Sequence, residues 1–192
     1  MEDSGIDVIV SAPQKGWSGP CCVGIALLNQ KAYNLSLKKR PTSFSCNLTK
    51  WLEIMKKYEG GGFGYHTTLP TDSLTTFRNA IKDTYAMGLD VAKTKATELG
   101  QRIRKVCEAK GWKSVAQKGF ESPTVVTMYC NDANMVAKFK GEGIQVAGGV
   151  PFKVGEPEGL LTVRIGLFGV EKLKNVDVAV KNFENALAKI VK

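Results

Sequence analysis

The sequence is poor in the residues from which a metal site, a disulfide framework or a membrane anchor is built. It contains five cysteines and a single histidine, and no two cysteines form a Cys-x-x-Cys pair. This composition argues against a zinc site and favours reduced thiols in an intracellular protein. No apolar run approaches the roughly 20 residues that a membrane-spanning helix requires. The acidic amino terminus lacks the basic region of a signal peptide. We therefore expect a cytoplasmic protein without a membrane partner, although a peroxisome or mitochondrion fits the same composition.

What is present is the composition of an ordinary globular protein. The chain has 192 residues, of which 43% are hydrophobic, enough for one large domain or two small ones. The net charge of +9 favours anionic partners, but a solvated lysine-rich surface is the commoner cause of such a charge. The densest basic patch, residues 38–40, has no interleaved aromatic residues and no RNA-binding motif. We expect it to be a solvated loop and expect no nucleic-acid partner.

The pattern of apolar residues predicts an α/β protein in which two strands come first. Residues 6–11 and 22–28 are short apolar runs bounded by turn residues, and they could pair as a hairpin with a long connection. Two helices follow, one opened by Asn47 and one capped by Thr71 or Asp72. Gly88 interrupts the helical pattern, and we place the main domain boundary after it.

The remainder alternates between strands and helices. Strands are expected at residues 114–117, 124–130, 144–147 and 161–167, and helices at 89–111, at 133–140 and from Asn175 onwards. This order predicts a small α+β domain with helices on one side of a sheet, over residues 89–192.

Lys15 is the first candidate for chemistry. It lies in the turn SAPQKGWSGP, at the carboxyl end of the first apolar strand, a position at which α/β proteins bind ligands. A desolvated or cation-flanked lysine has a lowered pKa and can form a Schiff base. The alternative is a surface lysine in a turn, and composition alone favours it.

Two further motifs could bind anions. Tyr65 and Thr68 follow a glycine-rich turn and offer two hydroxyl groups just before a helix amino terminus, which favours phosphate. The alternative is a capping loop with an exposed tyrosine. Arg164 alternates with Val163 and Ile165 along a strand, and its planar fork suits a carboxylate. The alternative is an arginine on the solvent face of that strand.

Several stretches taken together resemble the class V pyridoxal-phosphate-dependent aminotransferases, in particular the alanine–glyoxylate and serine–pyruvate aminotransferases. They are GIDVIVSAPQKGWSGP, SFSCNLTKWLEIMKKYEGGGFGYHTTLPTDSL, FESPTVVTMY, GIQVAGG and TVRIGLFG. They stand in the family's order and spacing, and the resemblance covers essentially the whole chain.

The resemblance implies a role for each candidate. Lys15 is similar to the lysine that binds pyridoxal phosphate covalently, and Gln14 to its neighbour near the cofactor phosphate. Tyr65 and Thr68 match residues that reach the phosphate of the neighbouring subunit's cofactor, which implies a homodimer with shared active sites. Arg164 matches the arginine that binds the α-carboxylate of the amino acid and 2-oxo acid substrates. The implied reaction moves an amino group from alanine or serine to glyoxylate or pyruvate.

The resemblance also implies that this chain is the carboxyl-terminal half of a fold-type I transferase. Residues 1–88 would be the last part of the large-domain sheet, and residues 89–192 the small domain. The family's phosphate-cradling turn, its ring-stacking aromatic residue and the aspartate that pairs with the pyridine nitrogen would all precede Met1. We therefore expect either part of a longer or complemented aminotransferase or, alternatively, a truncated, non-catalytic remnant that binds a partner.

Overall fold

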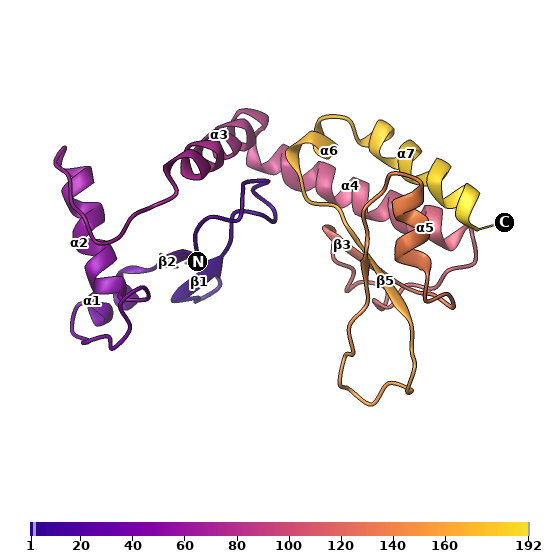
Figure 1. Cartoon of the computed structure of the whole chain (residues 1–192), viewed down its shortest axis with the longest axis horizontal. Coiled ribbons are helices and arrows are strands. Elements are labelled where there is room, and N and C mark those ends of the chain that lie inside the picture. Colours follow the sequence, from indigo (N-terminus) through magenta and orange to yellow (C-terminus); the bar gives the residue numbers. More distant parts are fainter. Residues whose placement is uncertain (2, 192) are drawn as a thin grey trace. The chain divides into compact units, whose positions relative to one another are not determined.

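The chain forms two compact units, each with its own small sheet (Figure 1). The computed structural model describes residues 1 and 3–191. The first unit comprises residues 1–14 and 19–78, and the second comprises residues 15–18 and 79–192. The short segment 15–18 therefore belongs by its contacts to the second unit. These contacts divide the chain after Arg78, and the domain boundary after Gly88 stays a prediction.

The sheet of the first unit is a two-stranded antiparallel hairpin. Strand β1 (Val8–Ser11) pairs with β2 (Ile25–Leu28), with Val8 opposite Leu28 and Ser11 opposite Ile25. Both predicted strands and their pairing are confirmed, although each strand is shorter than its apolar run. Within the described residues no further strand joins either edge. Apolar side chains are exposed on this hairpin, including that of Val10 at 77%.

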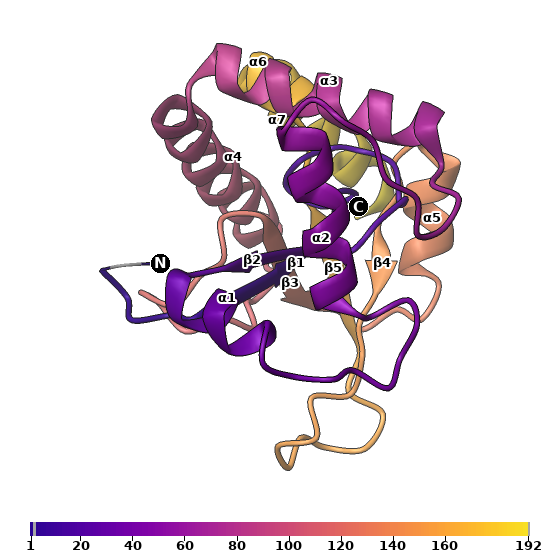
Figure 2. The ribbon, with the colours of Figure 1, turned by 90° about the vertical axis from the view of Figure 1, so that its left-hand side faces the viewer.

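Three helices belong wholly or partly to this unit. Helix α1 (Gln30–Ser36), which the sequence did not predict, follows β2 and packs against it (Figure 2). Helix α2 (Leu48–Glu59) begins as predicted at Asn47, whose side-chain oxygen accepts from Lys50 N at 3.0 Å. Helix α3 (Thr71–Met87) begins at Thr71 itself, so that Thr71 and Asp72 lie in its first turn.

The second unit is a three-stranded antiparallel sheet covered by helices. Its strand order is β3 (Val125–Tyr129), β5 (Thr162–Gly166) and β4 (Ala147–Gly148). The helices are α4 (Leu89–Glu108), α5 (Met135–Gly141), α6 (Val170–Lys174) and α7 (Val176–Ile190) (Figure 1).

Alternation along the strands explains this packing. Val126 and Met128 lie opposite Ile165 and Val163, and all four are buried. One buried cluster joins them to Leu99, Ile103, Phe139, Leu173, Phe183 and Leu187 of the four helices. This is the small α+β arrangement that the sequence predicted. In the described part of the chain, no helix has both the length and the apolar character needed to cross a bilayer.

Two predicted strands are nearly absent. Residues 114–117 form only a bridge, Ser114 with Met128, because the segment pairs beside β3 for a few residues and then turns away. Residues 144–147 contribute only the start of β4. Helix α6 was not predicted, because a helix of five residues that begins after Gly169 is too short to show helical periodicity.

Candidate functional site

The turn that carries Lys15 has a fixed backbone course. It follows the buried Pro13, and Gly19 N donates to Pro13 O at 2.9 Å. Within the turn, Ser18 N donates to Lys15 O at 3.0 Å. Ser18 has φ 55°, in the left-handed region that non-glycine residues seldom adopt. The turn therefore holds one strained residue and presents Lys15 at its tip.

Two contacts tie this turn to the second unit, to which residues 15–18 belong. The hydroxyl of Ser18 accepts from Val170 N at 3.0 Å, at the first residue of α6. The ammonium of Lys15 lies 5.9 Å from the centroid of the Phe168 ring, within the range of a cation–π contact. Lys15 is otherwise exposed, and within the described residues its amine has no hydrogen-bond or ion-pair partner. The amine is thus positioned but available.

Arg164 occupies the central strand of the same unit. It pairs with Thr127 on β3 and with Ala147 on β4, and its side chain lies on the face opposite the buried core. Its Nε donates to Gly148 O at 2.9 Å. Its two terminal nitrogens make no hydrogen bond to any residue that the structure describes. The guanidinium is therefore oriented through one nitrogen while the other two remain available to a carboxylate.

Tyr65 and Thr68 form a pair of adjacent hydroxyl groups in the first unit. Tyr65 Oη and Thr68 Oγ1 are 3.1 Å apart, and both residues are exposed, Tyr65 at 74%. Because the two residues are only three positions apart, their hydroxyl groups can meet within one loop without long-range contacts. Two adjacent hydroxyl groups can donate to the same oxyanion.

The loop that carries this pair is anchored on both sides of Tyr65. Gly64 O accepts from Tyr58 Oη at 3.3 Å, and a Cβ at Gly64 would lie only 2.8 Å from Ile54 Cδ1. His66 Nε2 lies 3.1 Å from Phe44 O. The single histidine is thus engaged in a structural hydrogen bond.

Gln14 ends the first unit's opening segment and is exposed. Its side chain makes no hydrogen bond within residues 1 and 3–191. Of the five predicted site residues, Gln14, Tyr65 and Thr68 lie in the first unit, and Lys15 and Arg164 in the second. The structure brings one pair, Tyr65 and Thr68, into direct contact.

The sequence did not identify the residues that position Lys15. Phe168 lies within TVRIGLFG and Ser18 within SAPQKGWSGP, so both stand in motifs that carry the resemblance. Nothing in a single sequence indicates that these two motifs meet, because Ser18 and Val170 are 152 residues apart.

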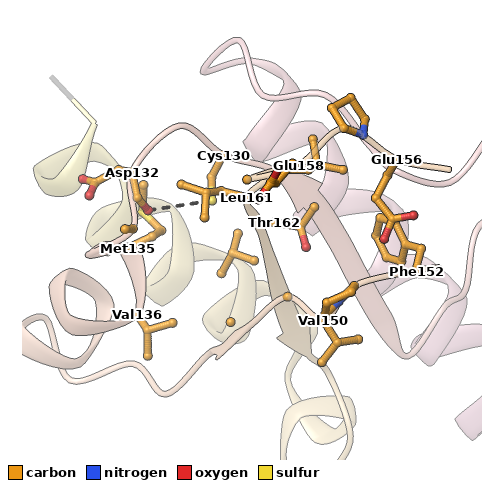
Figure 3. A pocket seen from close by; sticks show the side chains of 18 residues that line it. Cys130, Asp132, Met135, Val136, Val150, Phe152, Glu156, Glu158, Leu161 and Thr162 are labelled. Carbon is orange, nitrogen blue, oxygen red and sulfur yellow. Dashed lines mark hydrogen bonds between the residues drawn. The ribbon is translucent and has the colours of Figure 1, made fainter. Parts of the chain in front are cut away.

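A cavity of about 440 Å³ lies beside β5, between α5 and the loop before that strand (Figure 3). Cys130 and Thr162 lie on one side, and Phe152 and Glu156 come from the loop. Backbone N–H groups of Lys153 and Val154 hold the pKa of Glu156 at about 2. The cavity has no lysine or arginine in its described lining, so its chemistry does not suit a phosphate or a carboxylate.

Comparison with curated proteins finds aminotransferases. The chain is 29% identical over 185 residues to serine–glyoxylate aminotransferase of Hyphomicrobium methylovorum, covering 89% of this chain and 45% of that protein. It is 26% identical over 196 residues to alanine–glyoxylate aminotransferase of Felis catus, covering 97% and 46%. The chain therefore spans about half the length of the curated relatives it matches. No family model matches it.

Solved structures agree on the fold. Alanine–glyoxylate aminotransferase from Nostoc superposes with a TM-score of 0.73 at 22% identity, over 97% of this chain and 49% of that one. Aspartate aminotransferase from Thermus thermophilus gives 0.75 at 20% identity, over 99% and 51%. Ureidoglycine–glyoxylate aminotransferase from Bacillus subtilis gives 0.74 at 18% identity, over 98% and 48%. The chain is thus similar to the class V pyridoxal-phosphate-dependent aminotransferases, and its fold is that of about half of a fold-type I transferase.

Proposed function

We propose that this chain supplies the covalent cofactor lysine and the substrate-carboxylate anchor of a pyridoxal-phosphate-dependent aminotransferase, as part of a longer or complemented enzyme. The observation that carries the proposal is the position of Lys15. Its exposed amine is held over Phe168, directly after the strand that contains Arg164. An amine and a guanidinium, both in the second unit, are the two groups that an aldehyde cofactor and an amino acid require.

The residues present fit the cofactor's chemistry. An unpartnered amine suits the aldehyde, and the adjacent hydroxyl groups of Tyr65 and Thr68, 3.1 Å apart, suit the phosphate. Gln14 adds an amide donor beside Lys15. When bound, pyridoxal phosphate supplies the electron sink of the reaction.

Lys15 has two tasks in this proposal. Its amine would hold the cofactor covalently through the aldehyde group, which would fix the cofactor to the turn. When it is not holding the cofactor, the same amine would accept a proton from the substrate's Cα and later return one. Ser18 and Phe168 keep the amine near its place during both tasks, because they hold the turn to the second unit.

Arg164 orients the substrate. The bond from its Nε to Gly148 O, at 2.9 Å, fixes the guanidinium plane, so its terminal nitrogens can donate two parallel hydrogen bonds to the α-carboxylate. The relatives' names support alanine or serine as the amino donor and glyoxylate as the acceptor. Pyruvate is the alternative acceptor.

Tyr65 and Thr68 bind the cofactor phosphate of a second subunit in this proposal, which makes the enzyme a homodimer with shared sites. Their support is local. The two hydroxyl groups are already paired, the loop is anchored at Gly64 and His66, and the side chain of Tyr65 is exposed.

The experiment is to label the purified chain with pyridoxal phosphate, reduce it with borohydride and map the modified lysine by mass spectrometry. The same measurement is made after adding the amino-terminal half of the Hyphomicrobium relative. We expect stoichiometric modification of Lys15 in at least the complemented sample, and its loss in Lys15→Arg. Modification scattered over other lysines in both samples would refute the proposed role of Lys15.

The second candidate is a non-catalytic fragment that binds a partner protein. The exposed apolar side chains of the β1–β2 hairpin, such as Val10 and Leu27, favour it. It predicts a complex with the complementing half but no selective modification of Lys15, so the labelling experiment separates the two functions.

A further inference from the structure

A second cavity, of about 750 Å³, lies entirely within the second unit, and its lining includes none of the residues proposed to bind the cofactor. It is bounded by the carboxyl-terminal part of α4 and by the segment 114–123 that leads into β3. Arg104 projects from α4 into this lining and is only 7% exposed. A charge buried to this extent normally has an ionic partner, because its desolvation is expensive.

Among the residues that the structure describes, Arg104 has no such partner. Its Nη1 and Nη2 donate to Gly100 O and Ser122 O at 3.4 and 3.3 Å, which are long contacts to neutral oxygens. No carboxylate of the described residues lies within 4.0 Å of it, and its buried Nε has no hydrogen-bond partner there either. Ser114 lines the same cavity, and its buried hydroxyl is likewise unpartnered within the part of the chain that the structure describes.

The other charges of the lining are mixed. Lys105 and Lys118 are exposed cations, and Glu108 and Glu121 are the acids. The carboxylate of Glu121 is engaged, since it accepts from Gly119 N at 2.6 Å. Backbone N–H groups of Glu121 itself and of Gly119 lower the pKa of this carboxyl, with a smaller contribution from the nearby Arg104. Three cationic groups thus face two anionic ones, and of the three cations only Arg104 is buried.

We propose that this cavity binds a phosphate group, free or carried by a small molecule, with Arg104 as its buried anchor. Arg104 donates through Nε and one terminal nitrogen, and Ser114 donates through its hydroxyl. Lys118 and Lys105 complete the neutralisation from the rim. A phosphate group offers these donors more acceptor oxygens than a single carboxylate does. Its lining shares no residue with the proposed cofactor site, so, on the proposed function, it adds an effector or second ligand site to the enzyme.

The test is a titration of the ¹⁵N-labelled full chain with sodium phosphate at constant ionic strength, followed by NMR. We expect saturable shifts of the backbone amides around Ser114 and Ser122 and of the Arg104 Nε–H signal. Arg104→Gln weakens the affinity by about tenfold or more, the loss expected for a charge-assisted hydrogen bond. Arg102→Gln is the matched control, because it removes the same charge from α4 where Arg102 pairs with Glu98 and Asp177 at the surface. It leaves the affinity unchanged.

A second variant and competing ligands test the proposal even if Arg104→Gln does not fold. Lys118→Gln lies on an exposed segment and weakens phosphate binding severalfold. Sulfate competes with phosphate, whereas acetate does not, and glycerol phosphate in place of inorganic phosphate distinguishes a carried group from a free ion. The proposal is overturned by the absence of saturable shifts in the unmodified chain, by equal affinity in Lys118→Gln and Arg102→Gln, or by acetate binding as tightly as phosphate. Arg104→Gln leaves the borohydride labelling of Lys15 intact, which separates this site from the proposed function.

Discussion

Gly100 is the position at which a single methyl group is expected to be most damaging to the second unit. It is buried on α4 where the helix meets Pro123. A Cβ at Gly100 would lie 2.5 Å from Pro123 O and 2.9 Å from Pro123 Cα. Non-bonded carbon atoms prefer separations of about 3.5–4.0 Å, so the helix or the segment must move by about 1 Å. No rotamer change relieves the contact, because the opposing atoms are backbone.

The cost follows from two opposing effects. Overpacking of a core costs about 1–3 kcal/mol, and the upper end applies to a backbone clash. Alanine has a better helix propensity than glycine by about 1 kcal/mol. Gly100→Ala should therefore lower the free energy of unfolding by about 2 kcal/mol.

Urea unfolding followed by circular dichroism measures this difference through the transition midpoint at a common m-value. Gly141→Ala is the matched control, because a Cβ there meets nothing within 4 Å and the residue ends α5. The control should be as stable as the unsubstituted chain or slightly more stable. Equal midpoints for Gly100→Ala and Gly141→Ala would refute the close approach of α4 to Pro123.

Three further predictions concern single groups. Asn175→Ala removes the side chain that caps α7, so the midpoint of urea unfolding should fall by the equivalent of about 1 kcal/mol; an unchanged midpoint would contradict the cap. Burial raises the pKa of the Cys107 thiol to about 12, so iodoacetamide should modify the exposed Cys46 and leave Cys107 unmodified. Equal rates of modification at the two cysteines would argue against the burial of Cys107. The pKa of the Glu156 carboxyl is held at about 2, so this group keeps its backbone hydrogen bonds at neutral pH and loses them as the pH falls through about 2. The NMR shift of the Val154 amide, which donates to this carboxylate, should therefore titrate near pH 2. A midpoint near the ordinary carboxyl value of 4.5 would contradict the contact.

The elements with strong local signals could be predicted from the sequence. Helix α7 has a capping asparagine and an apolar stripe, and both recur in the structure. The pairing of β1 with β2 follows from two apolar runs separated by turn residues. By contrast, residues 114–117 have strand-like composition, but the chain turns away from β3 after a single bridge. Tertiary packing overrides a weak local preference at that point.

In the candidate site, too, local contacts could be predicted from the sequence and long-range contacts could not. The spacing of Tyr65 and Thr68 is local, so the sequence indicates that their hydroxyl groups meet. The position of Lys15 depends on Phe168 and on the first residue of α6, and no periodicity connects such distant segments. The cavity beside Arg104 was not predicted for a related reason, since the isolation of its guanidinium depends on which carboxylates fold near it.

The bond between Ser18 and Val170 also sets an order of events during synthesis. During translation the partner N–H of Val170 is added 152 residues after Ser18. Until then the Lys15 turn has neither that hydrogen bond nor the ring of Phe168, while the apolar hairpin beside it has already emerged. A nascent chain arrested before α6 should therefore carry a loose Lys15 turn and an exposed hairpin, which is the state in which chaperones are most needed. The Lys15 turn can make both contacts only after Phe168 and Val170 have been translated.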